Sequence, residues 1–374
     1  MQNIGIITYH SAYNYGSALQ ALATQEAIRK VTSCNVSILN YRTSEQKRVY
    51  ALYRKMHGPK IFLEDCFLLP IHAKRKKHNE RFESFFKKYM NLTSTIFTPD
   101  QAIEMMTSFD VMISGSDQIW NKYSLELANV PWDDMRPYLL CGFNGKKISY
   151  ASSIGNMTDD EIIRIKEDIE KFDSVSCRES VSAERLRKLT MCKPKEVLDP
   201  TFLLDKDEWI HLLGLKETTE KYILFYGLGG LGYLHNILKT LKPYATKRGL
   251  KLKVVMPYAY LPFQGSEVEF CADAGPKELL ELIMNASMVV TNSYHGTILS
   301  VNFGKELYSI CTPGGSEFRK TEILKKVGLS ERVIESVNTI ADKDGKAIDY
   351  NGVANKLYWL RQDSLTYIQN ALNL

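Results

Sequence analysis

The chain has 374 residues, of which 44% are hydrophobic, and a formal net charge of +5. This length favours two domains, and no stretch approaches the roughly 18 apolar residues that a membrane-spanning helix requires. The start has no basic signal-peptide region, and the seven scattered cysteines form no C-x-x-C pair, which argues against disulfides and zinc. We therefore expect a cytoplasmic protein with reduced thiols and no metal.

The first half of the chain alternates predicted strands and helices. Short apolar runs predict strands at 3–9, 35–40, 110–113, 147–151 and 174–177. Apolar residues at helical spacing predict helices at 17–30, which Ser17 can cap, and at 159–172. This alternation is typical of a parallel sheet with right-handed crossovers.

A second alternating series follows residue 205. Apolar runs predict strands at 222–226, 251–256, 287–291 and 306–310. Helical patterns occupy 233–248, 276–285, 296–303 and, at the end of the chain, 351–372. The two series predict an α/β protein with two Rossmann-like domains whose parallel sheets face a cleft.

Short polar motifs follow several of these predicted strands. They occupy residues 14–17, 115–120, 176–179, 199–201 and 291–297. Ligands of α/β proteins bind at the carboxyl ends of strands, so we expect the five motifs to converge on one cleft. Their residue types favour an enzyme that binds an anion.

Two motif residues are candidates for proton transfer. His295 follows a predicted strand and can donate or accept a proton near neutral pH, and the helix that begins near Gly296 and Thr297 can bind an anion. The alternative is a histidine that is hydrogen-bonded in a turn. Asp117 can orient or deprotonate a sugar hydroxyl, or it can cap the next helix.

Arg178 directly follows the predicted strand 174–177. An arginine there suits a carboxylate or a phosphate, and its alternative is a salt bridge to Glu179 or Glu184. Asp199, before a proline, is typical of a rigid turn at a domain junction.

Two loops are candidate ligand contacts. Backbone N–H groups and small polar side chains at 10–16 can hold an acceptor, although a plain strand-to-helix turn explains Gly16 equally well. The segment 227–232 matches G-x-G-x-x-G, but Lys251 and Lys253 occupy the strand where a dinucleotide site needs an acidic residue. A flexible or ligand-approaching loop is therefore favoured over a dinucleotide site.

The motifs as a set resemble the polysaccharide pyruvyl transferase family. The matching segments, in the family order, are 8–21, 113–121, 149–155, 176–180, 198–204 and 291–300. The resemblance implies a GT-B-like fold whose C-terminal helix crosses back to the first domain. We expect an N-terminal domain at 1–205 with a basic helical insertion at 42–90, a second domain at 206–345 and the returning helix at 346–374.

The resemblance also implies an activity. It is the transfer of pyruvate from phosphoenolpyruvate to two hydroxyls of a sugar, which forms a ketal. The acceptor would belong to a cell-surface polysaccharide, such as a capsule or exopolysaccharide, or to its lipid-linked precursor. Phosphoenolpyruvate would be the donor substrate, and no cofactor is expected.

Carried onto this sequence, the family motifs imply a set of site residues. The motif positions are Asp117, Arg178, Asp199 and His295. Family members can carry a basic residue where this chain has Ser293, so Arg319 and Lys320 in the loop 313–321 are candidates for the missing cation. The full expected substrate-binding set is Asn14, Tyr15, Gly16, Ser116, Asp199, Asn292, Ser293, Gly296, Thr297, Arg319 and Lys320.

The segment 42–88 holds 13 Lys and Arg residues against five Asp and Glu. One interpretation is a solvated helical insertion. The other is contact with an anionic membrane at the inner face, because the acceptors can be lipid-linked. No nucleic-acid-binding motif accompanies the charge, so a nucleic-acid partner is not expected.

Two other functions stay open. One is a GT-B-like glycosyltransferase that uses a nucleotide sugar, for which the loop 227–232 could approach the diphosphate. The other is a non-catalytic carbohydrate-binding relative, which the presence of Asp117, Arg178 and His295 disfavours.

Overall fold

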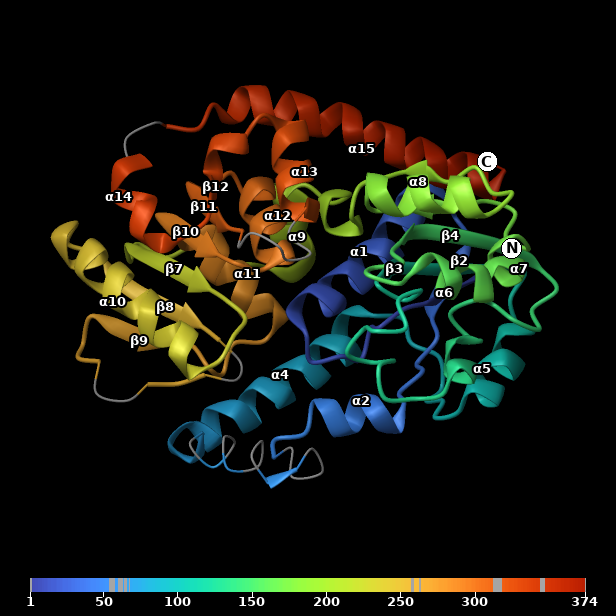
Figure 1. Ribbon diagram of the computed structural model, residues 1–374, viewed down its shortest axis with the longest axis horizontal. Coiled ribbons are helices and arrows are strands. Elements are labelled where there is room, and N and C mark those ends of the chain that lie inside the picture. The colour runs from blue at the N-terminus through green and yellow to red at the C-terminus, as the bar shows by residue number, and fades with distance from the viewer. Residues whose placement is uncertain are drawn as a thin grey trace. The chain divides into compact units, whose positions relative to one another are not determined.

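The computed structural model describes residues 2–53, 58–59, 63, 66, 68–256, 259–261, 264–311, 318–343 and 347–373. The chain forms two compact units (Figure 1). Unit 1 comprises Met1–Ala51, Ser84–Leu204 and Tyr358–Leu374, and unit 2 comprises Leu52–Glu83 and Asp205–Leu357.

Unit 1 is built on a six-stranded parallel sheet in the order β2-β1-β3-β4-β5-β6. Its strands are β1 (Asn3–Ile7), β2 (Asn35–Ile38), β3 (Val111–Asp117), β4 (Lys146–Ser152), β5 (Ser176–Cys177) and β6 (Lys195–Glu196). Its helices include α1 (Tyr15–Val31), α2 (Ser44–Val49), α5 (Pro99–Met106), α6 (Asp159–Arg164), α7 (Lys166–Ile169) and α8 (Ser180–Leu189). Strands β1, β3 and β4 are almost wholly buried, because a parallel sheet is covered by helices on both faces.

Unit 2 is built on a second six-stranded parallel sheet, in the order β12-β11-β10-β7-β8-β9. Its strands are β7 (Tyr222–Tyr226), β8 (Lys251–Val255), β9 (Val268–Phe270), β10 (Met288–Thr291), β11 (Leu307–Ile310) and β12 (Val333–Ile334). Its helices include α9 (Lys206–Leu213), α10 (Leu231–Lys247), α11 (Pro276–Asn285), α12 (Tyr294–Asn302), α13 (Phe318–Val327) and α14 (Ile340–Lys343).

Both strand orders contain a topological switch point. In unit 1 the chain leaves β1 for β2 on one side and then returns to β3 on the other. In unit 2 it leaves β7 for β8 and β9, and then returns to β10 on the other side of β7. Ligands of open α/β sheets bind outside the carboxyl ends of the strands at such a point. The prediction of two Rossmann-like domains is confirmed.

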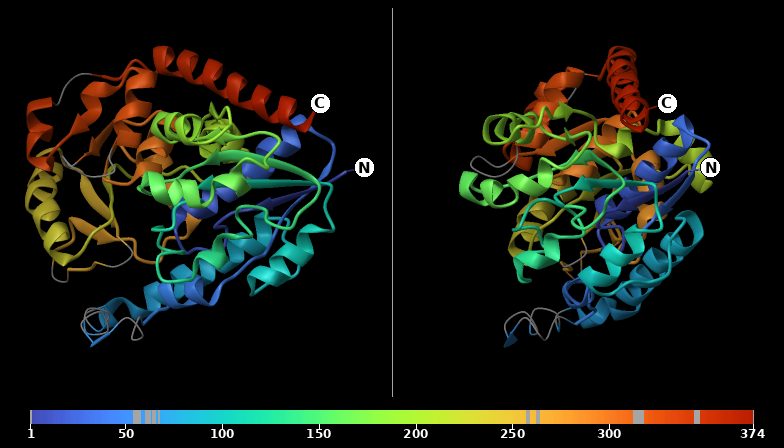
Figure 2. Two further views of the ribbon diagram at one scale, coloured as in Figure 1. Left: turned by 45° about the vertical axis from the view of Figure 1, so that its right-hand side comes forward. Right: turned by 90° about the vertical axis from the view of Figure 1, so that its right-hand side faces the viewer.

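Two helices pass from one unit to the other. Helix α4 (His72–Tyr89) begins in unit 2 and ends in unit 1, and α15 (Tyr350–Leu372) does the same. The later turns of α15 contact unit 1 (Figure 2), where the Ser364 hydroxyl accepts a hydrogen bond from Leu198 N at 3.0 Å and Tyr367 Oη donates to Ser149 O at 2.8 Å. No helix in the described ranges combines the length and the apolar character that a membrane crossing needs.

The structure corrects two predicted helices. The single helix expected at 159–172 is divided into α6 and α7, because Ile165 leaves the helical conformation with φ −104° and ψ 5°. Helix α1 begins at Tyr15, and its N-cap is Asn14 rather than Ser17. The hydroxyl of Ser17 is therefore not the cap of its own helix.

Candidate functional site

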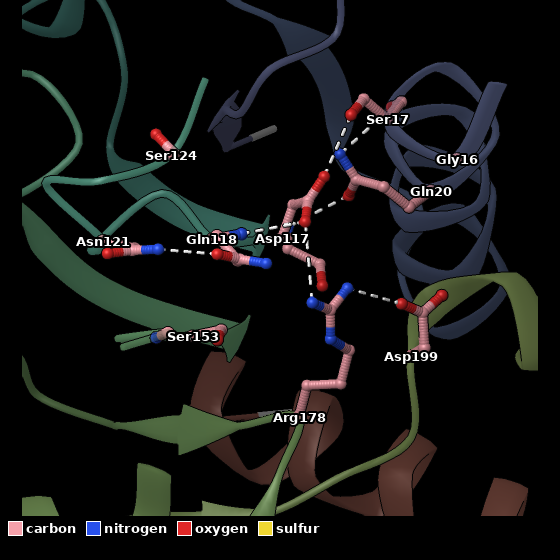
Figure 3. Close-up of polar contacts among 12 residues, drawn as sticks. Gly16, Ser17, Gln20, Asp117, Gln118, Asn121, Ser124, Ser153, Arg178 and Asp199 are labelled. Carbon is pink, nitrogen blue, oxygen red and sulfur yellow. Dashed lines mark hydrogen bonds and ion pairs between the residues drawn. The ribbon is translucent and has the colours of Figure 1, made fainter. Parts of the chain in front are cut away.

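In unit 1, one buried arginine lies among three carboxylates, of which Figure 3 shows those of Asp117 and Asp199. Arg178 follows β5, and its Nη1 donates to Asp199 Oδ2 at 3.0 Å. Its Nη2 lies 3.5 Å from Asp117 Oδ1, and its Nε lies 3.5 Å from Glu179 Oε1. The cluster therefore carries an excess of negative charge.

These contacts match the salt-bridge alternative for Arg178. Its side chain is 1% exposed, and those of Asp199 and Glu179 are 0% and 2% exposed. An anion at this guanidinium would lie beside three carboxylates in a poorly solvated place, which is electrostatically unfavourable. Arg178 is therefore suited to hold Asp117 in place rather than to bind an anionic substrate.

Asp117 is the member of the cluster that a ligand can reach, since its side chain is 15% exposed. It ends β3 with φ 84°, a left-handed conformation that non-glycine residues seldom adopt. Gly115, two residues earlier, has φ 133°, and a Cβ there would lie 2.0 Å from Tyr150 O. Asp117 Oδ1 accepts from Gln118 N at 2.9 Å, so the carboxylate holds its own turn and does not cap a helix.

A buried polar network fixes the backbone beside Asp117. Gln20 Oε1 accepts from Ser116 N at 3.1 Å, and Thr8 Oγ1 donates to Ser116 O at 3.0 Å. Gln20 Nε2 also donates to Thr8 Oγ1 at 2.7 Å. The Ser116 hydroxyl is buried and donates to Ala151 O, so this residue places Asp117 through its backbone.

The first strand-to-helix turn adds a further contact to Asp117. Asn14 Oδ1 accepts from Gly16 N at 2.9 Å and from Ser17 N at 3.5 Å, and Tyr15 is buried in the first turn of α1. Because Asn14 occupies these two amides, the Ser17 hydroxyl points elsewhere and donates to Asp117 Oδ2 at 2.9 Å (Figure 3).

Unit 2 carries a different polar centre, at the start of α12. Ser293 is the N-cap, and its Oγ accepts from Gly296 N at 3.2 Å. Gly296 allows close packing, since a Cβ there would lie 2.3 Å from Thr291 Oγ1. The Thr297 hydroxyl donates to Ser293 O at 3.0 Å and is buried.

His295 is the second residue of α12. It is 9% exposed, and its ring packs edge-to-face against that of Tyr294 with 5.2 Å between the centroids. The first N–H groups of a helix have no acceptor within the helix and carry the positive end of its dipole. The arrangement suits a small anion beside His295.

Two cationic side chains of α13 lie near this helix start. Lys320 is 3% exposed, and its Nζ donates to Asn292 O at 2.8 Å and to Ile310 O at 2.6 Å. The Arg319 guanidinium lies 5.4 Å from the centroid of the Tyr294 ring. Both residues belong to the first turn of α13 rather than to a loop, and residues 313–317 of the expected loop lie outside the described residues.

The glycine-rich segment follows β7 at the switch point of unit 2. Asn292 holds it with two hydrogen bonds, from Leu228 N to Asn292 Oδ1 and from Asn292 Nδ2 to Leu228 O, both of 2.8 Å. Helix α10 begins at Leu231, so Gly232 lies inside the helix.

Within unit 2, acidic side chains and one backbone carbonyl contact several cations of the basic segment 42–88. Lys77 and Arg81 lie 3.3 and 2.9 Å from Asp273 Oδ2, and Arg81 also pairs with Glu278. Lys74 Nζ donates to Phe270 O at 2.9 Å. Part of the local positive charge is therefore neutralised. Ile61, Phe62 and Phe67, which are apolar residues of the same segment, lie outside the described residues.

The predicted residues thus form two groups, each at the switch point of its own sheet. The group in unit 1 joins Asp117, Arg178 and Asp199, and the structure adds Ser17, Gln20 and Glu179, which we did not predict as site residues. Ser17 and Glu179 lie inside the quoted motifs. The contact of Ser17 with Asp117 spans 100 residues and leaves no local signal in the sequence. Glu179, by contrast, directly follows Arg178 and is one of the two salt-bridge partners that the sequence suggests for it.

Comparison with known proteins identifies the family. The sequence matches the model of the polysaccharide pyruvyl transferase family over residues 14–310. Because the match spans most of the chain, this protein belongs to the polysaccharide pyruvyl transferase family. A sequence search of curated proteins finds no match.

Solved structures with the same architecture are distant in sequence. A UDP-N-acetylglucosamine 2-epimerase has a TM-score of 0.56 at 10% identity, with 100% of this chain and 95% of that one covered. The Methanocaldococcus jannaschii UDP-GlcNAc 2-epimerase, in complex with UDP-GlcNAc and UDP, has a TM-score of 0.50 at 11% identity, covering 97% and 100%. The Streptomyces sp. SF2575 glycosyltransferase SsfS6, complexed with thymidine diphosphate, has a TM-score of 0.50 at 14% identity, covering 100% of both chains. These similarities show the GT-B-like fold alone.

Proposed function

We propose that this protein transfers a pyruvyl group from phosphoenolpyruvate to two hydroxyls of a sugar, forming a cyclic ketal. The family supports the transferase class. The observation that carries the choice of donor is the start of α12, where Ser293, His295 and the nearby cations of α13 offer a small anion a positive environment. Phosphoenolpyruvate, with a carboxylate and a phosphate on one short carbon frame, has the charge that such a place favours.

The proposed reaction is balanced without a cofactor. A proton added to the methylene carbon of phosphoenolpyruvate makes the methyl group and leaves positive charge on the central carbon. One sugar hydroxyl attacks that carbon, the bond from the carbon to the phosphate oxygen breaks, and the second hydroxyl closes the ketal. The two sugar hydroxyls lose one proton each. One of these protons balances the proton added to the methylene carbon, and the other leaves as part of hydrogen phosphate.

We assign the proton transfers to two residues. His295, in unit 2, is the general acid for the methylene carbon or the partner of the phosphate, because it lies at the start of α12 and an imidazole can donate a proton or a hydrogen bond. Asp117, in unit 1, orients the acceptor hydroxyl and takes its proton, because its carboxylate is partly exposed and held by neighbouring donors. Arg178 acts through Asp117.

We further propose that the acceptor belongs to a cell-surface polysaccharide or to its lipid-linked precursor, and that the enzyme works in the cytoplasm at the inner membrane face. The proposal rests on the family and on the basic segment 42–88, which holds 13 Lys and Arg residues against five Asp and Glu. Co-sedimentation with phosphatidylglycerol vesicles, compared with phosphatidylcholine vesicles, measures the contact. Equal sedimentation with both vesicle types at low salt would contradict it.

Thermal unfolding with a ligand panel tests the choice of donor without knowledge of the acceptor. A ligand present at about 100 times its Kd stabilises the folded state by about 2.7 kcal/mol. We expect phosphoenolpyruvate to raise the Tm more than inorganic phosphate or pyruvate at the same concentration. Binding without phosphate release, across an acceptor panel, would instead support a non-catalytic carbohydrate-binding protein.

The second candidate function is glycosyl transfer from a nucleotide sugar. The glycine-rich segment at the switch point of unit 2, held by Asn292, is the observation that favours it. The solved structures with UDP or thymidine diphosphate share the fold. A rise in Tm with UDP-GlcNAc or UDP, and none with phosphoenolpyruvate, would move the assignment to this function.

A further inference from the structure

The bond between Ser17 and Asp117 joins two elements on opposite sides of the switch point in unit 1. Ser17 lies in the first turn of α1, which follows β1, and Asp117 ends β3. The donor and acceptor are 100 residues apart in the sequence, and their oxygens are 2.9 Å apart. The contact therefore exists only because the sheet places β1 beside β3.

The Ser17 hydroxyl is not needed to begin its own helix. Asn14 supplies the cap of α1, so a serine in the third helical position has no capping duty. Its hydroxyl is buried and directed at the one carboxylate of the Arg178 cluster that solvent reaches. A buried hydroxyl aimed at a partly exposed carboxylate is the arrangement expected of a group that orients it.

The carboxylate of Asp117 is held from both sides (Figure 3). Ser17 donates to Oδ2, whereas Gln118 N and the Arg178 guanidinium face Oδ1. Because donors face both oxygens of the carboxylate, this pattern fixes the plane of the group.

We propose that Ser17 is a positioning residue, which fixes the Asp117 carboxylate so that it can accept the proton of an acceptor hydroxyl. This inference rests on the proposed function, because it assumes that Asp117 acts on a sugar hydroxyl. Ser17 itself does not contact the reacting atoms. Loss of its hydrogen bond lets the carboxylate rotate, and a misplacement of about 1 Å can cost on the order of 100-fold in rate.

The charged and titratable groups around Asp117 determine how the pH profile responds. They are Arg178, which pairs with Asp199 and Glu179, together with Tyr9 on the β1 side and the buried Glu126. Ser17 and Arg178 both favour the ionised form of Asp117, whereas Glu126 opposes it when ionised. Removal of the Ser17 hydroxyl should therefore move the acid limb of the kcat profile to higher pH.

The test compares Ser17→Ala, Ser17→Thr and Thr24→Val. Thr24 is a matched control, because its buried hydroxyl lies on the same helix and bonds to Gln20 O at 2.8 Å.

Phosphate release from phosphoenolpyruvate is measured with p-nitrophenyl hexosides as acceptors. We expect Ser17→Ala to lower kcat by about 10- to 100-fold at little change in KM for phosphoenolpyruvate, with the acid limb shifted upward. Ser17→Thr should recover most of the rate, and Thr24→Val should keep it. Equal rates and equal pH profiles for Ser17→Ala and Thr24→Val would overturn the inference while the proposed function stands.

A double-mutant cycle tests the link between Ser17 and Asp117 separately from turnover, and it therefore applies even if the wild-type protein does not turn over this donor, an outcome that would sink the proposed function. Unfolding is measured in urea for Ser17→Ala, Asp117→Asn and the double variant. Coupling of at least about fivefold in the unfolding equilibrium constant, absent from the parallel cycle with Thr24→Val, supports a direct link. Additive effects in both cycles would refute it.

Discussion

In unit 1, Asp117 ends a strand at the switch point and joins Glu179 and Asp199 around one arginine. In unit 2, the strand ends at the switch point adjoin a helix start and the cations of α13. Strand β3 is the neighbour of β1 across its switch point, just as β10 is the neighbour of β7. The two places are therefore topologically equivalent but differ in the sign of their charge.

The difference shows how one architecture can serve two chemically distinct ligands. Carboxylates accept hydrogen bonds from neutral hydroxyls, while helix N-termini and cations favour anions. We accordingly assign the sugar acceptor to unit 1 and the anionic donor to unit 2.

The largest effects are expected from one substitution in each centre. Asp117→Asn removes the base, and His295→Ala removes the acid or phosphate partner, so each should lower kcat by about 10²–10⁴-fold. The two variants should differ in donor binding, because only His295 lies in the centre of unit 2 that we assign to the anionic donor. Phosphoenolpyruvate should still raise the Tm of Asp117→Asn but should have a smaller effect on His295→Ala. A near-wild-type turnover for either variant would remove that residue from the mechanism, and loss of donor binding in Asp117→Asn alone would reverse the assignment of the two centres.

The next effect concerns the contribution of two buried arginines, Arg178 and Arg332, to the stability of the protein. Arg178→Met leaves carboxylates that are almost fully buried without their cation, which should cost about 3–5 kcal/mol of unfolding free energy. Arg332, in unit 2, is also buried, but its partners Glu306 and Glu331 are 28% and 54% exposed. Arg332→Met should therefore cost less.

Chemical unfolding at two pH values separates these cases. Protonation at low pH removes the uncompensated negative charge, so Arg178→Met should recover part of its loss between pH 8 and pH 5, measured relative to the wild type. A loss in Arg178→Met no larger than that in Arg332→Met, at either pH, would show that the cluster in unit 1 is less tightly coupled than its burial indicates.

A further carboxyl of unit 1 makes the stability of the protein depend on pH. Burial raises the pKa of Glu126 from 4.5 to about 7, although the Tyr50 hydroxyl donates to it at 2.7 Å. Above pH 4.5 the unfolded carboxyl ionises while the folded one stays protonated, so this contribution to stability falls as the pH rises towards 7. The loss is on the order of 3 kcal/mol.

Glu126→Gln tests this contribution, because the amide cannot ionise. Urea unfolding at pH 5 and pH 8 should show a smaller decrease for Glu126→Gln than for the wild type. Glu184→Gln, which changes an exposed residue of α8, should keep the wild-type dependence. An unchanged decrease in Glu126→Gln would mean that the carboxyl ionises in the folded state as readily as in water.

Regular elements of both units could be predicted from the sequence, but three of the four edge strands could not. Strand β7 and helix α11 lie where the apolar patterns place them. Strands β6, β9 and β12 have two or three residues each, which is too short for any periodicity to indicate.

The candidate site shows the same division between local and long-range information. Motifs in the sequence point to Asp117 and Arg178, but the choice between an anion and a salt bridge for Arg178 depends on which carboxylates approach it. Two of those carboxylates are Asp117, which ends β3 and lies 61 positions before Arg178 in the numbering, and Asp199. The cap of α1 was mistaken for a related reason. Asn14 and Ser17 are both residue types that cap helices well, and the choice depends on where the first turn of α1 begins, which is at Tyr15.

The smallest expected effects come from two helix caps, one in each unit. Asn14→Ala and Ser293→Ala each remove a side-chain acceptor for helix N–H groups, so each should cost about 1 kcal/mol of unfolding free energy. Their effects on the donor should differ, because Ser293 caps the helix start that we assign to the anion, whereas Asn14 caps the helix that carries Ser17. Ser293→Ala should therefore also reduce the Tm rise with phosphoenolpyruvate, and Asn14→Ala should leave that rise intact. Urea unfolding and the Tm with and without donor measure both quantities on the same samples. If the two caps had equal effects on the donor-induced rise, the charge difference between the two centres would not be what selects the donor.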